Sequence, residues 1–122
     1  MADIKDTAVR RIMRHQRVRK KVHGTQQRPR LVVFKSLKHL YAQVVDDDGQ
    51  RTVTGASTLS PEIRKALGGK SRTERAQEVG KLIALRIKEK SIDEVIFDRN
   101  GYRYHGIVKA LAEVVRDEKL LR

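Results

Sequence analysis

A run of basic side chains near the N-terminus carries the most definite chemistry in this sequence. Between Arg10 and Arg30 there is no acidic residue, and arginine outnumbers lysine. Such cations suit nucleic acid, because neutralising phosphates releases condensed counterions and the planar guanidinium makes bidentate phosphate contacts. The run predicts an arm that orders on nucleic acid, with a solvated tail as the alternative. The predicted phosphate-binding residues of the arm are Arg10, Arg11, Arg14, Arg17, Arg19, Lys20 and Lys21.

A second cluster mixes cations with aromatic rings. The segment 98–106, DRNGYRYHG, is expected to follow a parallel strand, at the end where α/β folds commonly hold ligands. Its composition suits phosphates together with unpaired or edge-exposed bases. The alternative is a turn at Asn100 and Gly101 with the tyrosines packed under the next helix, and the two are compatible because a packed tyrosine can keep its hydroxyl outward. The candidate RNA-binding residues here are Arg99, Tyr102, Arg103, Tyr104 and His105.

Carboxylates that converge on a divalent metal would instead indicate a nuclease or a phosphoryl-transfer enzyme. Residues 46–49, DDDG, are spaced like the beginning of a calcium loop, but the liganding glutamate is missing, so we interpret them as a hairpin turn. The acidic residues at 93, 94 and 98 flank a different strand. Nothing requires the two groups to converge, and no Ser-His-Asp or metal–histidine spacing occurs. The sequence therefore predicts no catalytic residue, no metal and no cofactor.

Length and composition limit the number of domains, the kind of partner and the compartment. A chain of 122 residues accommodates one domain plus the arm, and we divide it into an arm over residues 1–28 and a domain over 29–122. The formal net charge is +13, and the domain is basic as well as the arm, which indicates an extended polyanion touched by more than one surface. Aromatic content of 4% without tryptophan argues against a membrane surface, and the lack of cysteine fits the cytoplasm.

The hydrophobic pattern predicts three strands that position these residues. Residues 30–35, RLVVFK, are apolar on both faces and predict a central strand covered from two sides. A tight turn at 36–38 leads to an alternating strand over 39–46, whose half-polar face is open to solvent or RNA. A third strand follows over 51–58, where Gly55 marks a bulge or a close backbone approach.

Caps and helical spacing predict the rest of the fold. A short helix over 61–67 precedes a longer one to about residue 88, which begins with a capping box between Ser71 and Glu74. Gly80 within the longer helix permits close packing on the sheet. A strand over 92–98 then joins in parallel, and a helix runs from about 104 to 117. The fold class is α/β, with a mixed sheet of three antiparallel strands plus one parallel strand, packed by two longer helices.

Two stretches, residues 14–41 (RHQRVRKKVHGTQQRPRLVVFKSLKHLY) and 95–112 (VIFDRNGYRYHGIVKALA), closely resemble the bacterial family of large-subunit ribosomal protein eighteen. The resemblance covers nearly the full chain and implies a body similar to the ribonuclease H-like translational-component fold. It also implies a cytoplasmic protein of the ribosome, in the central protuberance, that binds 5S rRNA, contacts 23S rRNA through the arm and has other ribosomal proteins as neighbours. Asn100, Ile107 and the ending DEKLLR depart from the family pattern. An arginine is common in the family where Ile107 stands, so one of the phosphate contacts expected of the family is lost here.

Matching positions and side-chain chemistry extend the set of predicted RNA contacts. The first hairpin would grip 5S rRNA where it turns, and the open face of the sheet would offer stacking and hydrogen bonds. The residues so assigned are Arg30, Lys35, Ser36, Lys38 and His39 at the hairpin, and Tyr41 and Gln43 on the open face. The alternative function is a general RNA-binding or RNA-chaperone module without 5S specificity, which would discriminate weakly among polyanions.

Overall fold

The computed structural model describes residues 4–121, with side chains from residue 8 onward. Within that range the strands are β1 (Arg30–Lys35), β2 (Leu40–Asp46), β3 (Arg51–Ser57) and β4 (Ile96–Asp98), and they form one sheet in the order β3-β2-β1-β4. Strand β2 pairs antiparallel with β1 and β3, whereas β4 pairs parallel with β1. The predicted mixed sheet of three antiparallel strands plus one parallel strand is therefore confirmed.

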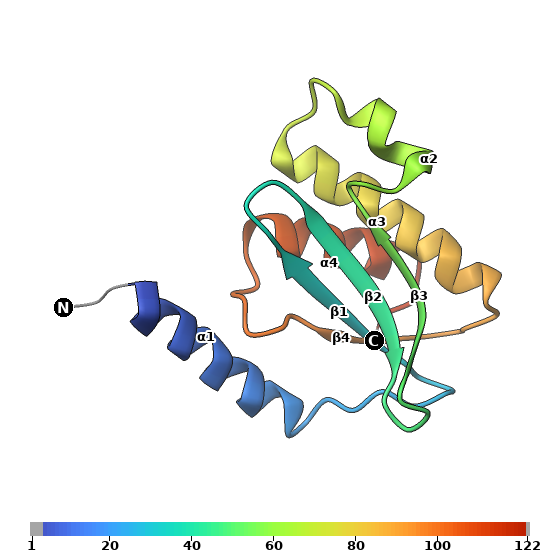
Figure 1. Ribbon diagram of the computed structural model, residues 1–122. Helices are drawn as coiled ribbons and strands as arrows, with labels where there is room; N and C mark the ends of the chain where they lie inside the picture. The colour runs from blue at the N-terminus through green and yellow to red at the C-terminus, as the bar shows by residue number, and fades with distance from the viewer. Residues whose placement is uncertain (1–3, 122) are drawn as a thin grey trace.

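Two long helices, α3 (Arg72–Glu89) and α4 (Gly106–Asp117), cover one face of this sheet (Figure 1). Helix α3 begins with the predicted capping box, because Ser71 Oγ accepts a hydrogen bond from Glu74 N at 3.2 Å and Glu74 Oε1 accepts one from Ser71 N at 3.4 Å. The predicted short helix is a single α-helical turn, α2 (Pro61–Arg64), that tightens into the 3-10 turn η1 (Lys65–Leu67). No helix in residues 4–121 is both long and apolar enough to cross a membrane.

The core lies between the two long helices and one face of β1 and β2. Alternate strand residues such as Leu31, Val33 and Val44 are fully buried there against Ile83 and Leu111. On the other face of β1, Val32 is half-buried and Phe34 is 48% exposed. The expectation that β1 is covered from two sides is therefore wrong. Its second face stays open because, in the part of the chain that the structure describes, both long helices pack on the first face.

Two glycines pack closely against neighbouring backbone. A Cβ at Gly80 would lie 3.0 Å from the Val114 Cβ and 3.1 Å from the Leu111 carbonyl oxygen, so this glycine allows α4 to pack closely on α3. The expectation that Gly80 packs on the sheet is therefore wrong. A Cβ at Gly55 would lie 3.1 Å from the Ala42 carbonyl oxygen, which supports the close-approach interpretation. The bulge of this strand pair falls between Val44 and Val45 instead.

The last strand and the last helix are both shorter than predicted. Strand β4 begins at Ile96, whose amide donates to the Pro29 carbonyl oxygen at 2.9 Å, because the amide of Val95 is turned away to the Leu120 carbonyl oxygen at 2.8 Å. Helix α4 begins at Gly106 because the preceding His105 is extended, with φ −156° and ψ 155°. The boundaries of 92–98 and 104–117 are thus corrected to Ile96–Asp98 and Gly106–Asp117.

The basic arm forms helix α1 (Ile4–Arg19), which lies beside the segment that follows β4 and continues through residues 20–29 into β1 (Figure 1). Its apolar side chains Val9, Ile12 and Met13 are about half exposed, and none of the side chains at 8–19 belongs to the core. Polar contacts, rather than burial of apolar surface, must therefore hold this helix to the body.

The Gly80 packing predicts the effect of a larger side chain. Gly80→Val should lower the free energy of unfolding by about 2 kcal/mol, because overpacking forces α3 and α4 apart. Urea unfolding followed by circular dichroism measures the change. The matched control is Gly68→Val, because a Cβ at Gly68 meets nothing within 4 Å and its φ of −58° suits any residue. Equal unfolding midpoints for the two variants would contradict the packing.

Candidate nucleic-acid interface

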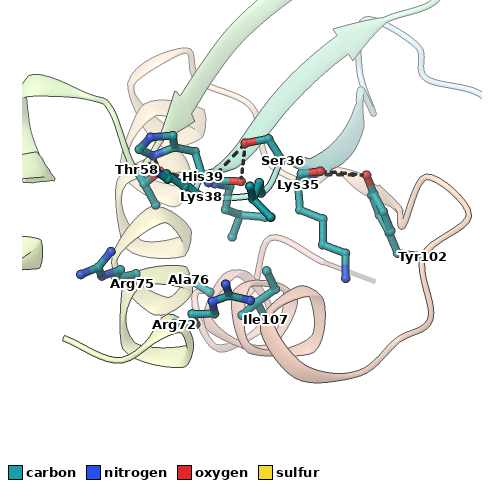
Figure 2. A pocket seen from close by; sticks show the side chains of 12 residues that line it. Lys35, Ser36, Lys38, His39, Thr58, Arg72, Arg75, Ala76, Tyr102 and Ile107 are labelled. Carbon is teal, nitrogen blue, oxygen red and sulfur yellow. Dashed lines mark hydrogen bonds between the residues drawn. The ribbon is translucent and has the colours of Figure 1, made fainter. Parts of the chain in front are cut away.

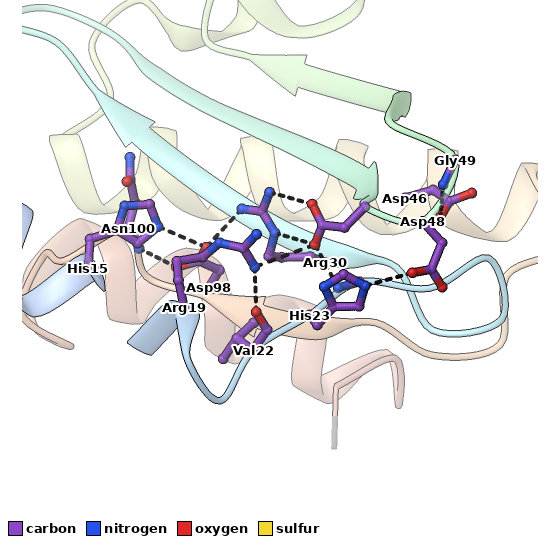
Figure 3. A network of polar contacts seen from close by, with 12 residues as sticks. His15, Arg19, Val22, His23, Arg30, Asp46, Asp48, Gly49, Asp98 and Asn100 are labelled. Carbon is purple, nitrogen blue, oxygen red and sulfur yellow. Dashed lines mark hydrogen bonds and ion pairs between the residues drawn. The ribbon is translucent and has the colours of Figure 1, made fainter. Parts of the chain in front are cut away.

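A buried carboxylate at the end of β4 is the centre of a polar network (Figure 3). Asp98 is 0% exposed and accepts hydrogen bonds from Arg30 Nη1 at 2.8 Å and from the Asn100 amide at 2.8 Å. His15 Nε2, from the arm helix, lies 3.1 Å from the same carboxylate. A buried charge is tolerated only when it is paired and hydrogen-bonded, so these partners are a condition of the fold. The network therefore ties the arm, β1 and the loop after β4 together.

Arg30 lies inside this network rather than on the surface. Its Nε and Nη2 donate to the two carboxylate oxygens of Asp47 at 3.0 Å each, and its side chain is 12% exposed. Burial works to lower the pKa of Arg30, but the hydrogen bonds to Asp47 and Asp98 outweigh it and raise the pKa above its usual value. Two carboxylates engage the guanidinium of Arg30, and its contact with RNA stays a prediction.

Three cations of the arm face the body of the protein. Arg11 Nη1 donates to the Asn100 carbonyl oxygen at 2.9 Å, and Arg14 Nε donates to the Gly101 carbonyl oxygen at 2.9 Å. Arg19 also reaches Asp47, at 3.4 Å. These contacts leave a smaller set of arm cations exposed for an external partner: Arg10, Arg17, Lys20 and Lys21.

The turn at Asn100 and Gly101 is the part of the loop that contacts the arm helix. Both residues have positive φ, 55° and 75°, which glycine adopts without strain. A Cβ at Gly101 would lie 2.2 Å from the Arg11 carbonyl oxygen, so α1 approaches the turn as closely as backbone permits. The predicted turn in this loop is confirmed.

Tyr102 joins the loop, the arm and the first hairpin. Its hydroxyl accepts from the Lys35 amide at 3.3 Å and lies 3.4 Å from the Lys35 carbonyl oxygen. The Arg11 guanidinium lies 4.8 Å and the Lys35 ammonium 5.1 Å from the centre of its ring, within the range of cation–π attraction. The half-buried tyrosine, which packs against the core, therefore positions two predicted RNA-binding cations.

The remaining loop residues differ in exposure. Tyr104 is exposed and meets Phe97 edge-on, with ring centres 6.3 Å apart. Arg103 and His105 are also exposed, whereas Arg99 is half-buried. The loop thus presents one cation and two rings to solvent next to the arm.

The hairpin turn is held by its own polar groups. Ser36 N donates to the His39 carbonyl oxygen at 2.9 Å, and His39 N donates to Ser36 Oγ at 3.2 Å. His39 Nδ1 lies 2.9 Å from Thr58 Oγ1, which ties the turn to the end of β3. Lys35 and Lys38 are exposed on either side. Ser36 and His39 therefore shape a turn from which two lysines project.

The open face of the sheet carries an aromatic pair. Phe34 and Tyr41 are cross-strand partners whose ring centres lie 6.1 Å apart. With Val32, Ser36 and Gln43 they line a shallow hollow of about 340 Å³. Phe34 lies on the face of β1 that was expected to be covered, because an apolar residue on each face of a strand does not show that both faces are buried.

A larger groove lies between this hairpin and α3 (Figure 2). It contains two arginines that the sequence analysis missed, Arg72 and Arg75, beside the predicted Lys35 and Lys38. Their position at the start of a helix was a signal in the sequence that could have identified them. Both lie in the first turn and a half of a helix, where the helix dipole disfavours cations.

The acidic candidates for catalysis are engaged by other partners, and Asp47 and Asp98 meet only through the guanidinium of Arg30. In the hairpin turn between β2 and β3, Asp46 Oδ1 accepts from the Gly49 amide at 3.0 Å, Asp47 binds Arg30, and Asp48 Oδ1 lies 2.7 Å from His23 Nε2. Each carboxylate is thus engaged in a different direction, and the interpretation as a hairpin turn is confirmed. Over residues 4–121 no group of three or more acidic or histidine side chains could hold a metal ion.

The adjacent aspartates give a test of the network. Asp47→Asn should lower the free energy of unfolding at pH 7 by about 2 kcal/mol, because it weakens charged hydrogen bonds to Arg30. Those bonds hold the pKa of Asp47 well below its usual 3.8. A lowered pKa in the folded state stabilises the protein above pH 3.8, and this contribution is lost as the pH falls below that value. The difference between variant and wild type should therefore shrink from pH 7 to pH 2.5 in urea titrations.

Asp48→Asn is the matched control, because the side chain of Asp48 is 62% exposed. Its free energy of unfolding should differ from that of wild type by no more than about 0.5 kcal/mol. A difference between Asp47→Asn and wild type that is the same at every pH would contradict the role of Asp47.

Comparison with known proteins gives a consistent result along the chain. The family model described as ribosomal L18 of archaea, bacteria, mitochondria and chloroplasts matches residues 5–121. The large ribosomal subunit protein uL18 of Thermotoga neapolitana is 57% identical over 111 residues, which cover 91% of each chain. The protein of the same name from Caldicellulosiruptor saccharolyticus is 53% identical over 111 residues, covering 91% of this chain and 90% of the relative. Because the match includes both the arm and the sheet that holds it, the chain belongs to the ribosomal protein L18 family.

Proposed function

We propose that this chain is a structural component of the large ribosomal subunit that binds 5S rRNA and helps attach it to 23S rRNA in the central protuberance. The family is one of ribosomal proteins rather than enzymes, and the relatives carry the name of the large subunit. The assignment of 5S rRNA rests on the resemblance of residues 14–41 and 95–112 to that family. The ribosome of the cytoplasm is the proposed location, with other proteins of the central protuberance as neighbours.

One observation supports this proposal most. The two resembling stretches, far apart in sequence, meet at one surface, because Arg14 contacts Gly101 and Lys35 contacts Tyr102. Cations from the arm and the hairpin, Arg11 and Lys35, therefore lie around one aromatic ring of the loop, that of Tyr102. An extended RNA could be contacted by all three elements at once.

The exposed groups divide by chemistry. Phosphates are the proposed partners of the exposed cations, because such contacts give affinity and register without reading sequence. Unpaired bases are the proposed partners of Phe34 and Tyr41 on the open face, where rings offer stacking. The cations assigned to phosphate are Arg10, Arg17, Lys20, Lys21, Lys35, Lys38 and Arg103.

A competition titration tests the proposal. The full-length chain is titrated against labelled 5S rRNA, with tRNA and duplex DNA as competitors, over a range of salt. We expect a strong preference for 5S rRNA. Neutralising Arg10, Arg17, Lys20 and Lys21 together should reduce the dependence of log K on log salt by about 3, because fewer counterions are released, while the preference for 5S rRNA remains.

The matched control neutralises four cations on the outer side of α3 and α4. Three of them already pair with carboxylates, Lys81 with Glu78, Lys88 with Glu118 and Lys109 with Glu113, and Arg116 is the fourth. This control should leave binding nearly unchanged. Equal competition by all three nucleic acids would contradict 5S specificity and favour a general RNA-binding or RNA-chaperone module.

A further inference from the structure

The groove between the first hairpin and α3 has a volume of about 630 Å³. Figure 2 shows Lys35 extending from the hairpin and Arg72 lying on α3 across the same space. The floor is apolar, formed by Leu40, Ala76 and Ile107. The groove therefore combines a basic rim with an apolar base.

The rim carries unbalanced positive charge. Lys35 and Lys38 stand on the hairpin side and Arg72 and Arg75 on the helix side, and no acidic residue is among the described residues that line the groove. Further along the same helix, cations are balanced, since Lys81 lies 3.4 Å from Glu78 and Arg86 pairs with Glu62. Among residues 8–121, none of the four rim cations has a carboxylate within ion-pair distance. The groove cations thus lack the carboxylate partners that Lys81 and Arg86 of the same helix have.

The position of the two arginines adds a second electrostatic cost. The start of a helix carries a partial positive charge, so cations there are disfavoured unless an anion lies nearby. Glu74, whose carboxylate accepts from the Ser71 amide at 3.4 Å, supplies one negative charge in the same turn against the two arginines and the dipole. Arg75 Nε donates to the Lys70 carbonyl oxygen at 3.1 Å, which fixes the side chain at the groove without neutralising it. An external anion would relieve both the crowding of cations and the dipole.

We propose that this groove binds an unpaired nucleotide of the RNA, with its base on the apolar floor and its flanking phosphates between Lys35 and Lys38 on one side and Arg72 and Arg75 on the other. The volume is in the range of small-ligand pockets, so it admits a single nucleotide but not a duplex. RNA presents unpaired bases in loops and bulges, where stacking and apolar contact are available.

An RNA is the occupant that the surroundings favour. Lys35 belongs both to the groove and to the cation–π contact with Tyr102, where the arm helix also meets the loop. The groove is therefore continuous with the cationic surface assigned above to 5S rRNA, and the inference rests on that proposed function. An acidic segment of a neighbouring protein is the competing occupant.

The test uses the full chain with both arginines neutralised, Arg72→Gln together with Arg75→Gln. Affinity for 5S rRNA should fall about tenfold, since two charged contacts are lost, and the dependence of log K on log salt should fall by about 1.5. The matched control on the same helix is Lys81→Gln with Lys88→Gln, which should change affinity less than twofold. Urea unfolding of each variant checks that it is folded as stably as wild type.

Chemical probing of the bound RNA locates the nucleotide. Wild type should protect an unpaired base that becomes reactive with the Arg72→Gln and Arg75→Gln variant, while protections elsewhere persist. Lys35→Gln with Lys38→Gln, on the opposite side, should expose the same base. Protections confined to paired regions, or an unchanged affinity of the arginine variant, would overturn the groove assignment and leave the acidic protein segment as occupant. If wild type itself shows no preference for 5S rRNA, the proposed function fails independently of the variants.

Discussion

The ion pair between Asp98 and Arg30 is the interaction on which the arrangement of the protein depends. An isolated carboxylate in the interior would be strongly destabilising, so Asp98 requires the guanidinium of Arg30 to be in place. Arg30 meets that need and is itself held by Asp47, while His15 brings the arm to the same oxygen. These three residues come from β1, from the turn between β2 and β3 and from the arm. One buried charge thus fixes where the basic arm leaves the folded body.

The surface cations of the protein differ between its two sides. Over α3 and α4 the surface cations are mostly paired with carboxylates, as with Lys88 and Glu118, and the interface with the sheet is the hydrophobic core. The other side has the exposed Phe34, the cations of the hairpin and the outer face of α1. Arginines bound to the body, such as Arg14 and Arg30, serve structure, whereas the unpaired cations remain available to phosphate. The division explains how a chain of net charge +13 can fold and still present a cationic surface.

Local patterns predicted the strands, the capping box of α3 and the parallel pairing of β4, because each depends on neighbouring residues or on a short crossover. The network was beyond sequence reasoning, since Arg30 and Asp98 are distant in the chain and nothing local shows which cation meets which carboxylate. The same limit applies to Gly80, where the pattern indicates a close approach but not that α4 makes it. Arg72 and Arg75 were overlooked because the capping box at Ser71 already explained the start of the helix.

The most direct test of this account is the affinity of Asp98→Asn for 5S rRNA, measured where circular dichroism shows the variant to be folded. Removing a negative charge from an RNA-binding protein should by simple electrostatics strengthen binding. If the network instead acts by positioning the arm, affinity should fall about tenfold, because the arm no longer engages the RNA together with the body. Asp48→Asn, which removes an exposed charge nearby, should bind as well as wild type or better. Equal or tighter binding by Asp98→Asn would contradict the central role of the buried carboxylate.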